Sequence, residues 1–113
     1  MAWDVVYTNE YQSWLDGLSA AEQAAVLVSL EILAEFGPLL GRPHADTVSG
    51  SRFKNMKELR TQAKGSPLRS FFAFDPNRTA VVLCGGDKTG DKQFYDRMIR
   101  IADSLYETHL STL

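Results

Sequence analysis

The chain has 113 residues, of which 44% are hydrophobic and 23% charged, as is usual for one folded domain. Its single cysteine, Cys84, excludes an internal disulfide and a cysteine-based zinc site. Residues 1–7 lack the basic segment of a signal peptide, and residues 24–36 are too short and too charged to span a bilayer, so we expect a cytoplasmic protein without membrane contact.

Charge is distributed unevenly along the chain. Residues 1–41 contain six acidic residues and no Lys or Arg, whereas residues 42–69 contain seven basic and two acidic residues. A cationic middle third inside a chain of net charge −2 predicts a site for an anionic partner. An acidic helical layer packed beside a basic sheet would explain the same pattern equally well.

The first part of the chain predicts a strand followed by two helices. Aromatic and β-branched residues indicate a strand over residues 3–8, and Thr8 or Asn9 can cap the helix that follows. The motif Ser19-Ala20-Ala21-Glu22 is a capping box and starts a second helix, which Gly37-Pro38 ends. This second helix is apolar on more than one side. That pattern favours deep burial, with a protein-binding face as the alternative.

The rest of the chain predicts a loop, three strands and a last helix. Residues 37–51 are rich in Gly, Pro, Ser and Asp and indicate a loop. Strands follow over residues 54–62, 68–74 and 79–84, and their short turns make them antiparallel. A helix over residues 91–109 ends the chain. The expected fold is a single α+β domain, β-α-α-β-β-β-α, with a small twisted sheet, mostly antiparallel, whose helices pack on one face and leave the other open.

Alternation along the strands places two arginines on one face of the sheet. Arg60 and Arg69 lie on neighbouring antiparallel strands and are expected to lie near each other. Two guanidinium groups at close range suit a phosphate, which they can grip in a bidentate way. The alternative is a solvated face on which Glu58 pairs with one arginine and Asp75 or Asp87 with the other.

Other motifs of catalysis are missing from the sequence. Residues 85–90 are rich in glycine but lack the spacing of a phosphate-binding P-loop. His44 and His109 are isolated in the sequence, so we expect no metal site, and Cys84 is expected to fill core space. Catalysis would therefore use Lys, Arg, Glu and Tyr side chains, without a metal or another cofactor.

Three segments and the C-terminal region together carry a family resemblance. These are Lys57-Glu58-Leu59-Arg60, residues 67–76 (Pro-Leu-Arg-Ser-Phe-Phe-Ala-Phe-Asp-Pro) and residues 85–90 (Gly-Gly-Asp-Lys-Thr-Gly), followed by Phe94-Tyr95 and residues 101–110. In this order and spacing they resemble the HigB-like, phage-derived Gp49-like branch of the RelE/ParE toxin superfamily. The resemblance covers the whole chain and is most specific over residues 57–110.

The resemblance implies a RelE-like fold and a toxin of a type II toxin–antitoxin system. Toxins of the RelE type are endoribonucleases that cleave mRNA in the ribosomal A site without a metal, and thereby inhibit translation. The partners it implies are the ribosome, mRNA and a cognate antitoxin of the helix-turn-helix type. Through that antitoxin, the toxin–antitoxin complex would bind operator DNA.

The resemblance also assigns roles to residues of this chain. A ribose 2′-OH would attack the adjacent phosphate, and Arg60 and Arg69 would stabilise the phosphorane-like transition state. Lys88 would hold the phosphate or act as the general acid, and Glu58 would act as the base or align Arg60 by an ion pair. Contacts with RNA are expected from six further residues: Lys57, Lys54, Arg52, Lys64, Lys92 and Tyr95. The alternatives are a packing role for Tyr95 and a solvated position for Lys92.

Two other functions fit the same fold. One is a ParE-like poison of DNA gyrase, against which the pair of arginines argues. The other is a catalytically inactive module that binds the antitoxin and regulates transcription, which the acidic half of the chain favours. If the chain is a nuclease, Arg69→Ala is expected to abolish toxicity without unfolding the protein, because Arg69 is predicted on an open face.

Overall fold

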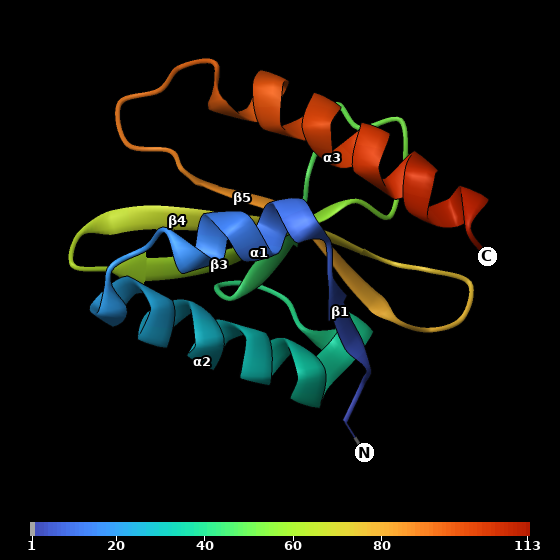
Figure 1. Cartoon of the computed structure of the whole chain (residues 1–113), viewed down its shortest axis with the longest axis horizontal. Coiled ribbons are helices and arrows are strands. Elements are labelled where there is room, and N and C mark those ends of the chain that lie inside the picture. Colours follow the sequence, from blue (N-terminus) through green and yellow to red (C-terminus); the bar gives the residue numbers. More distant parts are fainter. Residues whose placement is uncertain (1) are drawn as a thin grey trace.

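Five strands form one sheet in a computed structural model that describes residues 2–113. Their order is β1-β5-β4-β3-β2, with β1 parallel to β5 and the other neighbours antiparallel (Figure 1). The strands are β1 (Val5–Tyr7), β2 (Ala45–Thr47), β3 (Lys57–Ala63), β4 (Ser66–Phe74) and β5 (Ala80–Asp87). The helices are α1 (Asn9–Asp16), α2 (Ala20–Phe36) and α3 (Phe94–Ser111), with a short 3-10 helix, η1 (Gly37–Leu39), after α2. The α+β class is confirmed.

The predicted helix boundaries near the N-terminus are formed by side-chain caps. The Thr8 hydroxyl accepts a hydrogen bond from the Tyr11 N–H (3.0 Å) at the start of α1. Ser19 and Glu22 form both hydrogen bonds of the capping box that starts α2. Gly37 ends α2 with a φ of 54°, and a Cβ atom there would lie 2.3 Å from the indole nitrogen of Trp3. Only glycine fits that position.

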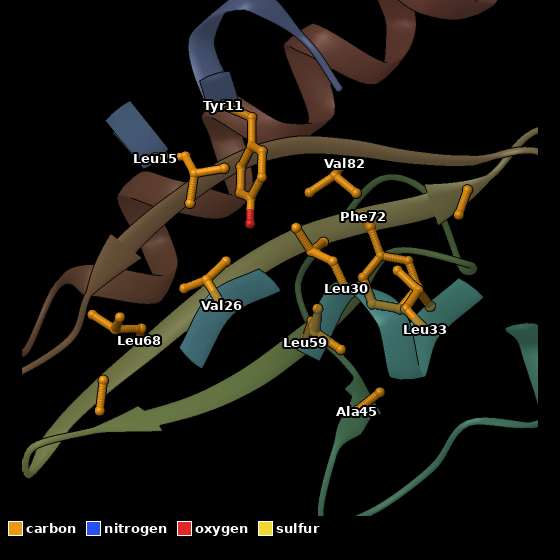
Figure 2. Packing of buried hydrophobic residues seen from close by; sticks show 12 residues of the cluster. Tyr11, Leu15, Val26, Leu30, Leu33, Ala45, Leu59, Leu68, Phe72 and Val82 are labelled. Carbon is orange, nitrogen blue, oxygen red and sulfur yellow. The ribbon is translucent and has the colours of Figure 1, made fainter. Parts of the chain in front are cut away.

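The helices lie on both faces of the sheet, which corrects the expectation of one open face. In Figure 1, α2 and α3 lie on opposite sides of the strands. Helices α1 and α2 pack on the face that carries Leu59 and Phe72 (Figure 2), whereas α3 packs on the face that carries Phe71 and Ala73. The physical reason lies in β4, which is apolar on both faces and would otherwise expose Phe71 to water.

A bulge in β5 places Cys84 in the core. Phe71 pairs with Cys84 and Phe72 with Val82, so Leu83 is an extra residue in β5. As a result Leu83 and Cys84 both pack in the cluster under α3. Cys84 is buried, as predicted for a core residue, and burial raises the pKa of its thiol to about 12.

The predicted loop over residues 37–51 contains a short strand. β2 pairs with β3 through Ala45 opposite Leu59, Asp46 opposite Glu58 and Thr47 opposite Lys57. Three residues without apolar alternation carry little strand signal, so the strand was not predicted. In the part of the chain that the structure describes, no helix is both long and apolar enough to cross a membrane.

The C-terminal end of α3 is fixed to the turn between β4 and β5 by a hydrogen bond between two side chains. His109 Nε2 lies 2.8 Å from Asp75 Oδ2, so His109 is not isolated in the structure. Burial alone would raise the pKa of Asp75. Hydrogen bonds from His109 and from the backbone N–H groups of Thr79 and Asn77 outweigh burial and hold this pKa below its ordinary value.

Asp75 should therefore contribute to the acid sensitivity of the fold. A carboxyl group whose pKa is lowered by folding stabilises the protein fully above its unfolded pKa of about 3.9, and this contribution is lost as the pH falls through the folded pKa. We expect the melting temperature of Asp75→Asn to be lower than that of the wild type at pH 6 and to fall less steeply below about pH 4. Thermal melts followed by circular dichroism test this. The same decrease of the melting temperature below about pH 4 in both proteins would contradict this expectation.

Candidate active site

Arg60 on β3 and Arg69 on β4 are direct cross-strand partners. Both lie on the sheet face that α3 partly covers, as the alternation of the strands predicted. The register that opposes them follows from the tight turn between Ala63 and Ser66. Two positive charges on opposed residues repel each other unless an anion lies between or beside them.

The anion between the two arginines is the buried carboxylate of Glu58. Its Oε2 accepts hydrogen bonds from Arg60 Nε (3.2 Å) and Nη2 (3.1 Å), and its Oε1 lies 3.5 Å from Arg69 Nε. Glu58 thus faces both arginines. The alternative interpretation is thus confirmed for Glu58, but its pairing of the second arginine with Asp75 or Asp87 is wrong, because Asp75 binds His109 and Asp87 accepts hydrogen bonds from Thr89.

Arg69 is buried, which corrects the prediction that it lies on an open face. Its side chain is only 10% exposed, and its Nη1 donates a hydrogen bond to the carbonyl of the neighbouring Leu68 (3.0 Å). Among residues 2–113, its Nε has no hydrogen-bond partner, although Glu58 is close enough to attract it electrostatically. Arg69→Ala therefore removes a buried charge and does not test chemistry alone.

Arg60 is the arginine of the pair that solvent reaches. Its side chain is 32% exposed and lies 3.6 Å from Asp46 Oδ2 on the edge strand β2. Asp46 also binds Arg42 at 2.7 Å. Arg60 lines a cavity of about 340 Å³ together with Glu58 and Tyr95. Of the two arginines, Arg60 lines this cavity and Arg69 does not.

Tyr95, from the first turn of α3, completes the cluster around Glu58. Its hydroxyl donates a hydrogen bond to Glu58 Oε1 (2.7 Å). Burial raises the pKa of Tyr95, and the hydrogen bond to Glu58 raises it further, so the phenol remains a donor. Lys88, in the segment after β5, places its Nζ 5.6 Å from the centre of the Tyr95 ring. The structure thus brings Lys88 beside the site.

The other predicted contact residues are placed differently. Arg52 shares a neighbouring cavity of about 470 Å³ with Tyr95, but its guanidinium is engaged by Glu107 (2.7 Å). Lys57 donates a hydrogen bond to Thr47 Oγ1 (3.2 Å) at the β2 edge. The remaining three residues are exposed and line neither cavity. Lys54 lies before β3, Lys64 lies in the turn between β3 and β4, and Lys92 lies before α3.

Sequence reasoning missed two residues near the site. Asp46 was missed because its strand was not predicted, although Arg42 four residues earlier is a possible sign of an ion pair. Arg100 lines the same cavity as Arg52 and Tyr95. The sequence signal for it is its position one helical turn after Asp96, which places both side chains on one side of α3. Across residues 2–113, no three His, Cys, Asp or Glu side chains gather in a way that could hold a metal ion.

Comparisons of the sequence identify relatives. The family model described as phage derived protein Gp49-like matches residues 13–107. The candidate toxin HigB2 of Mycobacterium tuberculosis is 48% identical over 101 residues, which are 88% of this chain and 50% of that protein. The chain thus spans half the length of that relative. The candidate toxin HigB3 of the same organism is 42% identical over 109 residues, which are 96% of this chain and 94% of that protein.

Comparisons of the structure identify the fold. A mutant of the E. coli toxin RelE in its free state superposes with a TM-score of 0.60 and 13% identity, over 89% of this chain and 99% of the other. A chain of the archaeal RelE–RelB complex from Pyrococcus horikoshii superposes with a TM-score of 0.58 and 15% identity, over 80% of this chain and 99% of the other. The chain therefore belongs to the phage-derived Gp49-like family, as a HigB-like protein with the RelE fold.

Proposed function

We propose that the protein is the toxin of a type II toxin–antitoxin system and that it cleaves mRNA on the ribosome without a metal. The observation that carries this proposal is the cross-strand pair of arginines around Glu58, with Arg60 open to a cavity lined by Tyr95. Guanidinium and phenol groups bind phosphate and stack on bases, which are the contacts that RNA offers. Family membership and the names of the relatives support the same function.

The geometry supports a division of roles among the site residues. Arg60 binds the scissile phosphate and stabilises the negative charge that develops on it. The 2′-OH attacks the phosphorus and gives its proton to solvent, while the bond from phosphorus to the 5′-oxygen breaks. Glu58 acts as a positioning residue, because its oxygens already face Arg60, Arg69 and Tyr95. Lys88, whose Nζ lies 5.6 Å from the centre of the Tyr95 ring, would bind the same phosphate or protonate the leaving 5′-oxygen. Arg69, whose Nε lies 3.5 Å from Glu58 Oε1, holds Glu58 in place.

The proposed partners follow from this function. The ribosome would supply mRNA in an accessible form to a protein whose residues 1–41 contain six acidic residues and no Lys or Arg, and which should therefore bind free RNA weakly. A cognate antitoxin of the helix-turn-helix type would neutralise the toxin in the cytoplasm, and the complex would bind operator DNA through that antitoxin. The RelE–RelB complex among the structural neighbours contains a protein of this fold with its partner.

Controlled expression in a bacterium tests the proposal. Growth is followed while the 5′ ends of cellular mRNAs are mapped before and after induction. We expect growth to stop and new cuts to appear inside translated messages, in register with codons. Arrest with intact messages and DNA damage signalling would replace the proposal with gyrase poisoning. No arrest would indicate a regulatory module without catalysis.

Asp46 should weaken the affinity of the site for RNA. Its carboxylate competes with phosphate for Arg60, and both side chains are partly exposed. We expect Asp46→Asn to bind a single-stranded RNA oligonucleotide about twofold to fivefold more tightly at low salt, as is typical for loss of one exposed ion pair. Fluorescence anisotropy measures this, with Asp91→Asn as the control, because Asp91 pairs with Arg97 elsewhere. Weaker binding by Asp46→Asn would show that Asp46 only supports the fold.

A further inference from the structure

Helix α2 carries an apolar stripe that the core does not use. Its core contacts are made by the buried side chains of Val26, Leu30 and Leu33. A second set, spaced by three or four residues along another flank, is exposed or only partly buried: Ala21, Ala25, Val28, Ile32 and Phe36. Residues at this spacing share one flank of a helix. Val28, in the middle of this stripe, is 56% exposed.

The stripe borders a groove between α2 and the edge of the sheet. The groove has a volume of about 540 Å³, with Val28 and Ile32 on one wall and Pro43, His44 and Arg60 on the other. It exists because β2 pairs with β3 only from Lys57 to Leu59. Beyond that point the chain keeps one backbone hydrogen bond, from Arg60 N–H to the His44 carbonyl (2.8 Å), and then turns away.

The two borders of the groove carry opposite charges. Glu31 and Glu35 are exposed beside the stripe on α2, and residues 1–41 contain no Lys or Arg. The opposite border includes Arg60, whose side chain is 32% exposed. A second copy of this chain that docked through its own α2 would place acidic residues against acidic residues, which is unfavourable. The occupant that these charges favour is therefore a different protein.

We propose that this groove binds an amphipathic helix of a partner protein. Apolar side chains at positions i, i+3 or i+4 and i+7 of that helix would pack on Val28 and Ile32. Lys or Arg along one edge would face Glu31 and Glu35, and Asp or Glu along the other edge would face Arg60. The small side chains of Ala21 and Ala25 permit the close approach of two helix axes.

Arg60 connects the groove with the candidate active site. The same residue lines both this groove and the cavity that contains Glu58 and Tyr95. An acidic residue of the partner that pairs with Arg60 removes the guanidinium that RNA would bind. This consequence rests on the proposed function, whereas the docking of the helix does not.

A synthetic peptide tests the docking without RNA. The probe is a fluorescent helical peptide with leucines at heptad spacing, Lys along one edge and Glu along the other, titrated with the whole protein and followed by anisotropy. We expect saturable binding that Val28→Glu weakens at least about tenfold. Leu27→Glu is the matched control. Leu27 is 47% exposed and lies about 100° further round the helix, so its change should alter affinity less than about twofold.

Further controls separate docking from folding and from catalysis. Both variants should melt at the wild-type temperature, and Val28→Ala provides a milder change if Val28→Glu does not fold. A peptide with Glu along both edges should bind less tightly, because Glu31 and Glu35 repel it. Equal losses for Leu27→Glu and Val28→Glu, or no saturable binding, would overturn the docking site. Peptide binding by a protein that leaves messages intact would support the groove and refute the nuclease.

Discussion

Arg60→Ala should lower the rate of ribosome-dependent RNA cleavage by about 10²–10³-fold, the usual cost of removing one preorganised donor to a developing negative charge. The expectation rests on the position of Arg60, whose partly exposed guanidinium is held by Glu58 over the cavity. The protein should still fold, because Glu58 keeps its contacts with Arg69 and Tyr95 when the Arg60 side chain is removed. The rate is measured on stalled ribosomes with a defined message.

Two further substitutions make the Arg60 experiment specific. Arg60→Lys keeps the charge but loses the planar pair of donors, so it should recover only part of the rate. Arg97→Ala removes an exposed arginine that pairs with Asp91 at 2.6 Å, and it should cleave at the wild-type rate. Cleavage by Arg60→Ala within a few-fold of the wild type would remove this residue from the chemistry and, with it, the main support for the nuclease proposal.

Glu58→Leu should lower the free energy of unfolding by about 3–5 kcal/mol, because it leaves the buried Arg69 without a counter-charge. It also leaves the hydroxyl of Tyr95 without its acceptor. Chemical denaturation followed by tryptophan fluorescence measures the loss. Arg60 contributes little to the effect, because it can turn to solvent and to Asp46.

A second substitution separates the electrostatic cause from simple loss of packing. Arg69→Met in the Glu58→Leu background removes the unpaired charge and keeps a long apolar side chain, so the double variant should be more stable than Glu58→Leu. Stability that falls further in the double variant would show that Arg69 is held by packing and by the Leu68 carbonyl, and that Glu58 is not its main partner.

The sequence predicted the arginine pair because it depends on local geometry. The short β3–β4 turn sets the register, and strand alternation then opposes Arg60 to Arg69. The alternation of side chains along a strand cannot show which helix covers a face of the sheet. The burial of Arg69 depends on the packing of α3, which brings Tyr95 against Glu58 across 37 positions of sequence. Such contacts leave no periodic signal in the chain.

The charges of the chain were predicted as two regions, and the structure shows how they are used. The basic middle third was predicted to form a site for an anionic partner, with an acidic helical layer beside a basic sheet as the alternative, yet Arg42 pairs with Asp46 and Arg52 with Glu107. Local propensity does not reveal such pairs when one partner lies in an unpredicted strand or far along the chain. The acidic helical half was correctly placed on α1 and α2, but the groove beside α2 depends on where β2 ends.

The parallel pairing of β1 with β5 has a consequence during synthesis on the ribosome. Val5 pairs with Ala80, and the Thr8 N–H donates to the Val82 carbonyl, so the first strand has no place in the sheet until β5 has left the exit tunnel. Contacts between distant parts of a chain form late and slow its folding. Tyr95 and α3 emerge later still. A nascent chain therefore leaves β1 unpaired until β5 emerges, and leaves the cluster around Glu58 incomplete until Tyr95 follows.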